Sequence, residues 1–475
     1  MNKHLVILSV PLIRIGRVLL GAPVLETIKE TCDVLIVSPN EPDSDFQKEF
    51  SAKGVKFYQW IVPGMSALNR MLGTIVTIQR MNGYWLRHRH KGMGLEYYHR
   101  NAVYTGLDDC SLKKLSLLKI VIYRLIAWTG YFSVSWRITD SLRGFLFRDA
   151  AKIDNVTNGY EKVTLIQSCS WGEQDTYLAW YAKKKKIRTI FIPYTTDQLY
   201  CNGFLLSDYD AVCIQGEFEK KCATRLHALS ELRQKNIGSA WFRHVDNLIN
   251  EIDTNPENSV SDVKYILFSG HSAQYYPRES EYKALASLEK IVSARFPGKV
   301  KIIYRPVCMT ADEIKKIQED WGNRENIEIQ LPQLSIVGTE KHVTKSLKEE
   351  WKDYIGQLQR ADVLVMSFLS SLALDISYLG KPAFIVFDDA TGKLEKKCIS
   401  LLFDAEGKMP GLEAFPIINN IENIVPLLEE ALKVPVNFSH LQKSVKKSWD
   451  FEKVNFREEL AYLIDSNTGF KNETR

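Results

Sequence analysis

The chain has few cysteines, and none of them form a metal-binding pattern. Its 475 residues include eight cysteines, with no Cys-x-x-Cys pair and no zinc-ligand spacing. Several lie inside apolar runs of strand length. This distribution argues against a disulfide framework and a zinc module, and it predicts free thiols in a reducing compartment. We therefore expect a cytoplasmic protein.

The chain also lacks a strong charge bias, an internal short-period repeat and a low-complexity tract. It contains 62 Lys and Arg against 57 Asp and Glu, a net charge of +5, which is too small to select one class of anionic partner. The amino-terminal stretch MNKHLVILSVPLI has no small-residue cleavage site, so we expect a first strand there instead of a signal peptide. The composition is otherwise that of a globular protein.

No apolar run is long enough to predict a membrane span. The nearest candidate is residues 117–136, LLKIVIYRLIAWTGYFSVSW, but Lys119 and Arg124 interrupt it, and charges near a bilayer centre are costly. Two alternatives remain, a buried helix pair or a helix lying in the membrane interface. We favour the buried helix because large apolar helices more often form core than membrane contacts.

The length exceeds what one hydrophobic core normally supports, so we expect two domains. Short apolar strands alternate with amphipathic helices in two series, which predicts an α/β fold with two Rossmann-like domains facing each other across a cleft. The polar stretch 251–262, EIDTNPENSVSD, is the predicted linker. The expected segments are an N-terminal domain at 1–252 with a helical insertion at 66–151, a C-terminal domain at 263–439, and a helix at 440–466 returning to the N-terminal domain.

The helical insertion contains a basic cluster at 87–91, RHRHK. It lacks paired histidines with an acid at helical spacing and shows no RNA-binding pattern, so we predict neither a metal site nor nucleic-acid binding. The adjacent pairs Asp108-Asp109 and Asp388-Asp389 are weak signals for a metal. We predict no required metal, and we expect the basic insertion to favour a lipid-linked or membrane-proximal acceptor.

The most informative stretch is 361–382, ADVLVMSFLSSLALDISYLGKP. It predicts a buried strand followed by a helix that begins near Ser370 and Ser371 and ends at Gly380. Unpaired amides at a helix start favour a diphosphate. Asp375, one turn further on, is a candidate to bind the hydroxyls of a ribose. An ordinary serine N-cap and a solvated Asp remain the alternative.

Two other predicted strands end at the same sheet edge. One ends in Ser269, Gly270 and His271, and the other ends in Arg305. Small residues after a strand often allow a close ligand, and a guanidinium there suits phosphate oxygens. A tight turn and a surface salt bridge are the respective alternatives.

The N-terminal domain offers candidates for chemistry and acceptor binding. Asp197, in YTTDQLYCNG, is a candidate general base, because transfer to a hydroxyl requires a group that takes its proton; capping of its own turn is the alternative. Glu217 opens a helix in IQGEFEKK and either supports a phosphate-binding loop or complements the helix dipole. Arg14 and Arg17 follow the first strand and are candidates for an anionic acceptor.

Taken together, these passages resemble GT-B glycosyltransferases of bacterial surface-polysaccharide biosynthesis, which are related to CDP-glycerol glycerophosphotransferase-like enzymes. The run 361–382 is similar to the family's donor segment, with Asp375 where the family usually has Glu. The run IIYRPV is similar to its Arg-x-His-Pro strand end but lacks the His. TTDQLYCNG followed by DAVCIQGEFEKK is similar to its Asp loop and Gly-Glu turn.

The resemblance implies an inverting, metal-independent transfer of a sugar from a nucleotide-sugar co-substrate to a glycan or lipid-linked acceptor, without another cofactor. Helix amides, Ser370, Ser371 and Arg305 would stabilise the leaving diphosphate in place of a cation, and Asp197 would deprotonate the acceptor. Separately from the resemblance, the basic insertion at 66–151 leads us to expect that the cytoplasmic protein contacts the inner face of the cell membrane.

Three other functions remain open. A UDP-sugar 2-epimerase shares the expected architecture but needs several acid and base residues around the sugar. A CDP-glycerol-type phosphotransferase would carry an acceptor-side histidine. A non-catalytic carbohydrate-assembly scaffold would bind a nucleotide without turnover.

Overall fold

The computed structural model describes most of residues 4–466, and contacts divide the chain into two compact units. Unit 1 comprises described residues up to His244 and from Trp449 onward, and unit 2 comprises Val245–Ser448. The description omits the following: 12, 40–43, 61–65, 89–120, 123–124, 127, 131, 147–150, 170–172, 196–197, 202–204, 206, 228, 254–262, 273–277, 308–310, 332–333, 338–339, 344–346, 368–370, 387–416, 419, 434–438 and 452.

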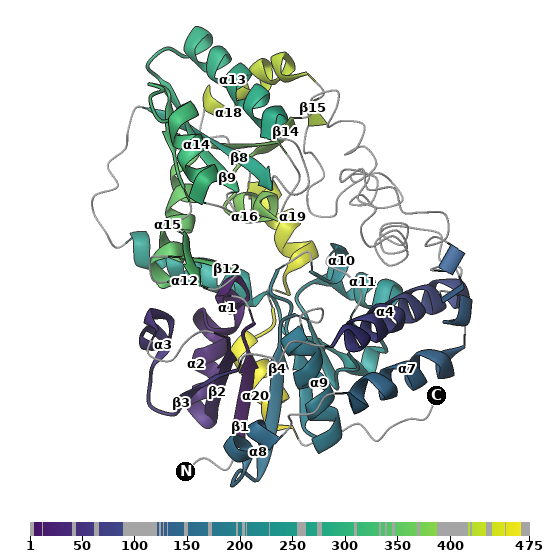
Figure 1. The fold of residues 1–475 in the computed structure, drawn as a ribbon. Coiled ribbons are helices and arrows are strands. Elements are labelled where there is room, and N and C mark those ends of the chain that lie inside the picture. The colour runs from purple at the N-terminus through teal and green to yellow at the C-terminus, as the bar shows by residue number, and fades with distance from the viewer. Residues whose placement is uncertain are drawn as a thin grey trace. The chain divides into compact units, whose positions relative to one another are not determined.

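Unit 1 is built on a seven-stranded parallel sheet (Figure 1). The strand order is β3-β2-β1-β4-β5-β6-β7, so the chain runs outward in one direction and then in the other from the β1/β4 boundary. Its strands are β1 His4–Ser9, β2 Asp33–Ser38, β3 Val55–Gln59, β4 Lys162–Gln167, β5 Arg188–Phe191, β6 Ala211–Ile214 and β7 Gln234–Asn236. Most side chains of the central strands are buried, as expected where both faces of a parallel sheet are covered.

Helices cover the sheet of unit 1. One core cluster joins Leu5 and Ile7 of β1 to Leu178 and Tyr181 of α9, whereas α2 contacts β2 and α20. The helices are α1 Ile13–Leu19, α2 Ala22–Thr31, α3 Asp45–Phe50, α4 Ala67–His88, α7 Ser133–Phe145, α8 Ala151–Thr157, α9 Glu173–Lys185, α10 Gln198–Cys201, α11 Glu217–His227, the 3-10 helix η1 Glu231–Arg233, and α20 Phe456–Asp465. The helix α12, Ala240–Asp253, contains the boundary between the units.

Unit 2 has a six-stranded parallel sheet and a separate hairpin. The sheet order is β10-β9-β8-β13-β14-β15, and β11 pairs with β12 antiparallel. The strands are β8 Lys264–Ser272, β9 Val300–Val307, β10 Ile327–Ile329, β11 Leu334–Val337, β12 Glu340–Val343, β13 Val363–Met366, β14 Ala383–Val386 and β15 Ile417–Ile418. The direction of winding reverses between β8 and β13.

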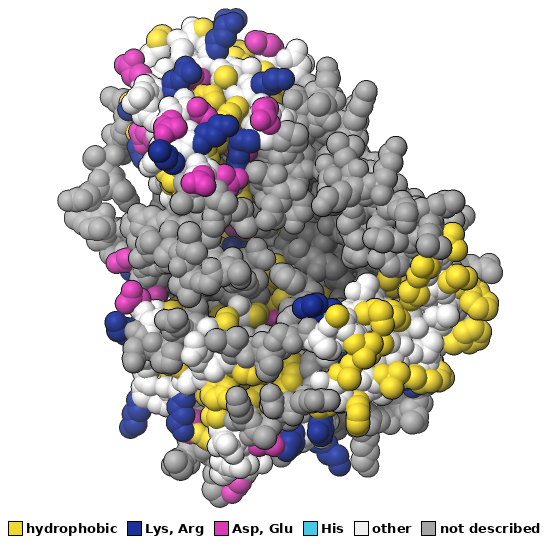
Figure 2. Space-filling model, in the orientation of Figure 1, with side chains coloured by type: hydrophobic (Ala, Val, Ile, Leu, Met, Phe, Trp, Pro, Cys, Tyr) yellow, Lys and Arg dark blue, Asp and Glu magenta, His cyan; other side chains and the backbone are white. Residues whose placement is uncertain are grey.

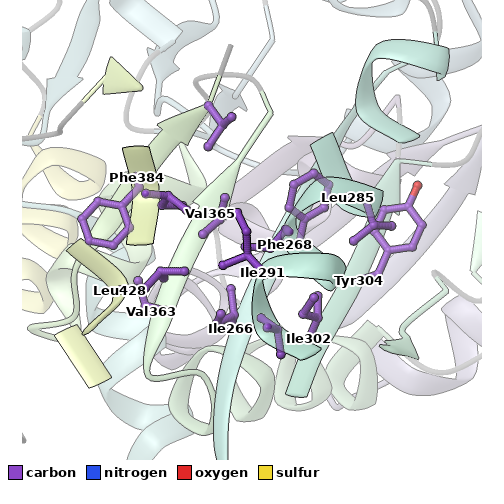
Figure 3. Packing of buried hydrophobic residues seen from close by; sticks show 14 of the residues in the cluster. Ile266, Phe268, Leu285, Ile291, Ile302, Tyr304, Val363, Val365, Phe384 and Leu428 are labelled. Atoms are coloured by element: carbon purple, nitrogen blue, oxygen red, sulfur yellow. The ribbon is translucent and has the colours of Figure 1, made fainter. Parts of the chain in front are cut away.

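The core of unit 2 lies between this sheet and three helices. Figure 3 shows Leu285 and Ile291 of one helix packed beside Phe268, Ile302 and other strand residues. The helices of the unit are α13 Arg278–Arg295, α14 Ala311–Trp321, α15 Leu347–Arg360, α16 Leu372–Tyr378, the 3-10 helix η2 Ile421–Ile424, α18 Val425–Lys433 and α19 Ser439–Trp449. Helices α13, α14 and α18 supply this core, while α15 contacts β8 and α16 contacts β14.

The predicted α/β class with two Rossmann-like domains and a helical insertion is confirmed. Helices α4 and α7 belong to the described part of the insertion, together with helical residues between 121 and 129. The preference for a buried helix at 117–136 is wrong, since Leu125, Trp128 and Phe132 are 57% to 65% exposed. In place of one helix at 440–466, the chain forms α19 and α20 with a break between them.

The predicted end of the donor-segment helix is confirmed. Gly380 has φ of +72°, the left-handed conformation that ends many helices. Its amide donates to Ser377 O at 2.9 Å, and the amide of Lys381 donates to Ile376 O at 3.2 Å. These two bonds form a Schellman motif, so Gly380 is the residue that stops α16. The helix begins at Leu372, two residues later than expected.

Candidate functional site

Three strand ends meet at the carboxyl edge of the unit 2 sheet, as predicted. Ser269 of β8 pairs in register with Arg305 of β9 and with Met366 of β13. The amide of Ser367, just after β13, donates to Ser269 O at 3.2 Å. This edge lies at the β8/β13 reversal, and ligands of open parallel sheets bind at such reversals. The strand ends therefore define a candidate ligand site within unit 2.

Arg305 is held at this edge by neutral groups. Its Nη1 donates to Gln357 Oε1 at 2.5 Å, and its guanidinium lies 4.8 Å from the ring centroid of Tyr354. No carboxylate of the described chain forms an ion pair with it, and Glu350 acts only as a more distant charge. Burial lowers the pKa of Arg305, which means that the surroundings do not compensate its charge. Arg305 is therefore suited to an anion.

Asp375 is buried in the same unit and already has one partner. It is 3% exposed, and its Oδ2 accepts a hydrogen bond from the Tyr354 hydroxyl at 2.5 Å. Because the Tyr354 ring also faces Arg305, this tyrosine connects the two candidate donor-binding residues. The sequence placed Asp375 one helical turn beyond the serines but gave no sign of Tyr354, which comes from α15.

The other predicted donor-binding residues have differing environments. The Ser269 hydroxyl donates to Gly270 O at 3.3 Å, and the residue is 7% exposed. Ser371 precedes α16 in a helical conformation, and its side chain makes no capping hydrogen bond. His271 is a residue of β8, without a described side chain, and Ser370 lies outside the described residues.

A buried carboxylate behind the β8 strand end was not anticipated. Glu281 is 0% exposed, and it accepts hydrogen bonds from Arg278 at 3.0 Å and from the Tyr304 hydroxyl. A Cβ at Gly270 would lie 2.1 Å from Glu281 Oε1. Position 270 therefore requires glycine because a buried carboxylate occupies the space of a side chain. The Arg and Glu spacing in RESE was the available signal for this pair.

Unit 1 has a second polar cluster at its own reversal between β1 and β4. Asp175, in the first turn of α9, is 0% exposed. Its Oδ1 accepts hydrogen bonds from Ser9 Oγ at 2.6 Å and from Gln167 Nε2 at 3.0 Å. Gln174 Nε2 donates to Ser9 Oγ at 3.1 Å. Ser9 and Gln167 end their strands, so the cluster lies at the carboxyl edge of the unit 1 sheet.

Burial dominates the electrostatics of Asp175. It raises the pKa of this carboxyl from 3.8 to about 7, and hydrogen bonds from the side chains of Ser9, Gln167 and Cys169 oppose the rise. The carboxyl therefore keeps its proton to a higher pH than an exposed aspartate does. Asp175 was not among the residues predicted from the sequence. The available signal was the polar residue that ends each of the two neighbouring strands.

The predicted residues of unit 1 are less closely grouped. Arg17 in α1 donates to Tyr194 O at 3.5 Å and stacks on Trp241 at 4.6 Å. Arg14 belongs to the same helix, without a described side chain, and Asp197 lies outside the described residues. The exposed Glu217 begins α11.

Glu219 is the buried carboxylate of the Gly-Glu turn that contains Glu217. It is 1% exposed and accepts a hydrogen bond from the Gln215 amide at 2.5 Å. The local support of the turn therefore comes from Glu219. Glu217, the first of the two glutamates in this helix start, was the predicted functional residue, and Glu219 was not predicted.

Two features are absent from the part of the chain that the structure describes. No three His, Cys, Asp or Glu side chains there lie close enough together to hold a metal ion. Of the helices within that part, none combines the length and the apolar character needed to cross a bilayer. Metal independence of the reaction remains a prediction.

Comparison with known proteins gives structural similarity only. No family model matches the chain, and no curated protein is detectably similar. Among solved structures, the wall teichoic acid polymerase TagF is 12% identical, with a TM-score of 0.47 and coverage of 98% of this chain and 88% of its own. A UDP-GlcNAc 2-epimerase from Neisseria meningitidis bound to UDP-GlcNAc is 11% identical, with a TM-score of 0.45. The match covers 97% of this chain and 98% of the epimerase.

A glycosyltransferase from Rickettsia africae ESF-5 is 10% identical to this chain, with a TM-score of 0.45. The alignment covers 98% of this chain and 100% of that one. Identities and TM-scores this low assign neither a substrate nor a reaction to the present chain.

Proposed function

We propose that the protein is an inverting, metal-independent glycosyltransferase that moves a sugar from a nucleotide-activated donor to a glycan or lipid-linked acceptor in bacterial surface-polysaccharide assembly. The observation that carries the proposal is the position of Arg305. This guanidinium lies at the carboxyl edge of the unit 2 sheet, beside the winding reversal, and its direct partners among the described residues are neutral. The cytoplasm, at the inner face of the membrane, is the proposed location.

The donor would bind in unit 2 through its diphosphate. Two phosphate oxygens can accept parallel hydrogen bonds from one guanidinium, a geometry that lysine cannot supply. Ser269, Ser370 and Ser371 would contribute hydroxyls, with His271 near the same strand end. Asp375 would contact the ribose through a carboxylate that Tyr354 orients by its hydrogen bond to Oδ2.

The transfer step would use a carboxylate of unit 1. Asp197 would take the proton of the acceptor hydroxyl as the hydroxyl oxygen forms a bond to the anomeric carbon of the sugar. The bond from that carbon to the diphosphate oxygen would break, and its electron pair would stay on the diphosphate beside Arg305. Glu217 would act in the same step, and Arg14 and Arg17 would hold an anionic part of the acceptor.

A nucleotide-binding panel tests the donor site. We expect one of UDP, GDP, CDP or dTDP to raise the melting temperature without magnesium, since a ligand of the native state stabilises it. Arg305→Ala should weaken that binding about tenfold to a hundredfold, because a charged hydrogen bond contributes roughly 1.5–3 kcal/mol. The matched control is Arg324→Ala, which removes an arginine of the same unit that stacks on Trp321 and pairs with Glu289.

Equal binding by Arg305→Ala and wild type, or no binding of any diphosphate, would overturn the assignment of the donor site. The transfer step has a separate test, in which Asp197→Asn keeps nucleotide affinity and slows transfer. Transfer at the wild-type rate would remove Asp197 as the base. Analysis of the products distinguishes the rival reactions: a free 2-epimer indicates an epimerase, a glycerol phosphate ester indicates a phosphotransferase, and tight binding without turnover indicates a scaffold.

A further inference from the structure

The helical insertion of unit 1 carries an exposed apolar surface. Eleven of the fourteen exposed large hydrophobic side chains among the described residues lie between positions 68 and 145. Figure 2 shows hydrophobic side chains gathered over α4 and α7. We define the apolar face by six of these residues: Trp128, Phe132, Val134, Ile138, Leu142 and Phe145, which are 56% to 87% exposed.

The apolar face belongs to an ordered, anchored helix pair. Between α4 and α7, Arg143 Nε donates to Asn69 Oδ1 at 3.0 Å, and both residues are buried. Arg80 of α4 forms an ion pair with Asp208 at 2.9 Å. Inner residues such as Val76, at 2% exposure, already supply the packing of the pair. The outward side chains are therefore not needed for that packing.

The spacing on α7 makes the exposed face continuous. Val134, Ile138, Leu142 and Phe145 follow one another at intervals of four, four and three residues, which places them along one side of a helix. An amphipathic helix normally turns this stripe toward the core, but here the stripe is the exposed side. Exposed patches of this kind mark interaction surfaces.

The charge of the insertion indicates what covers the face. Residues 66–151 contain thirteen Lys or Arg and five Asp or Glu. The rest of the chain contains 49 Lys or Arg and 52 Asp or Glu. The positive charge of the protein is therefore concentrated in the segment that carries the apolar face. Two copies meeting through this segment would bring like charges together, which disfavours a homodimer. An anionic bilayer satisfies both features, because its acyl boundary accepts apolar side chains and its headgroups attract cations.

We propose that the apolar face docks on the surface of an anionic lipid bilayer, with α7 lying along the interface. Trp128 and Phe132, whose ring centroids are 6.3 Å apart, are residue types that suit the interfacial region. The inference does not depend on the reaction proposed above, because it rests on a different surface of unit 1.

Vesicle co-sedimentation of the full chain tests the proposal. We expect binding to vesicles of equal parts phosphatidylcholine and phosphatidylglycerol, weaker binding to phosphatidylcholine alone, and loss of the difference at high salt because salt screens charge. The double substitution Ile138→Ser with Leu142→Ser should weaken partitioning by about tenfold or more, since each removes an apolar side chain from the acyl boundary.

The matched control is Leu232→Ser, which removes an equally exposed leucine, 58% against 56% for Leu142, from the 3-10 helix η1 of unit 1. It should bind vesicles like wild type, and both variants should melt at the wild-type temperature because the altered side chains are exposed. Failure of the wild type to bind anionic vesicles would overturn the proposal, as would unchanged binding by the double variant. Sedimentation equilibrium showing a dimer that the double variant dissociates would assign the face to a second copy instead.

Discussion

Replacement of Asp175 by asparagine should flatten the dependence of stability on pH. The carboxyl has a pKa of about 7 in the folded protein, against 3.8 for the unperturbed group. Below pH 3.8 the Asp175 carboxyl holds its proton in both the folded and the unfolded protein, so it causes no loss of stability there. As pH rises toward 7, the unfolded chain releases the proton and the folded chain retains it. Stability therefore falls over this window and changes no further above it.

The size of the effect follows from the shift. The folded and unfolded pKa values differ by about three units, and each unit corresponds to about 1.4 kcal/mol. Above pH 7 the carboxyl therefore lowers the free energy of unfolding by at most about 4 kcal/mol. Asparagine keeps the oxygen that accepts hydrogen bonds from Ser9 and Gln167 and has no proton to lose. The free energy of unfolding of the variant, relative to that of the wild type, should thus rise steadily between about pH 4 and pH 7.

Urea unfolding of both proteins across this pH range measures the difference directly. The matched control is Asp154→Asn, also in unit 1, where hydrogen bonds from Lys185 and Tyr181 lower the pKa of the carboxyl. A lowered pKa makes the wild type more stable as pH rises. Asp154→Asn should therefore lose stability relative to wild type as pH rises through the acid range. Parallel curves for the wild type and Asp175→Asn would refute the reasoning, since they would show that burial does not hold the proton on this group.

Two glycines of unit 2 give opposite predictions for the same substitution. Gly270→Ala should destabilise by about 1–3 kcal/mol, as overpacking does, because the new Cβ would lie 2.1 Å from Glu281 Oε1; wild-type stability in denaturant unfolding would contradict this. Gly356→Ala, in the middle of α15 with nothing within 4 Å of the new Cβ, should stabilise by about 0.5–1 kcal/mol through helix propensity, and a lower unfolding midpoint would count against it.

The architecture could be predicted because it rests on local pattern. Apolar runs of strand length and amphipathic helices alternate along both units, and the buried strand and the helix predicted within 361–382 form as β13 and α16. The stop at Gly380 was predictable for the same reason, since glycine followed by proline ends a helix within a few residues. The meeting of Ser269, Arg305 and Ser367 then followed from parallel pairing.

The buried carboxylates could not be predicted in this way. Asp175 is defined by Ser9 and Gln167, which come from two strands more than 150 residues apart, and Glu281 by Tyr304 of the next strand. Periodicity assigns a polar residue in a helix to the solvent side, so each of these was unremarkable in the sequence. For the apolar insertion the error was the opposite one: its hydrophobic stripe predicts burial, but the stripe is exposed in the structure.

The two units place opposite charges at comparable positions, and the consequences differ. Asp175 and Arg305 both lie at the carboxyl edge of a parallel sheet, where Asp175 accepts hydrogen bonds from neutral groups and Arg305 donates one to a neutral group. Asp175 can avoid the cost of burying a charge by keeping its proton at a pKa of about 7. A guanidinium stays charged at any physiological pH. No carboxylate among the described residues pairs with Arg305 to offset that cost, so an anionic ligand is the natural partner and Arg305 is the first residue to substitute in a search for it.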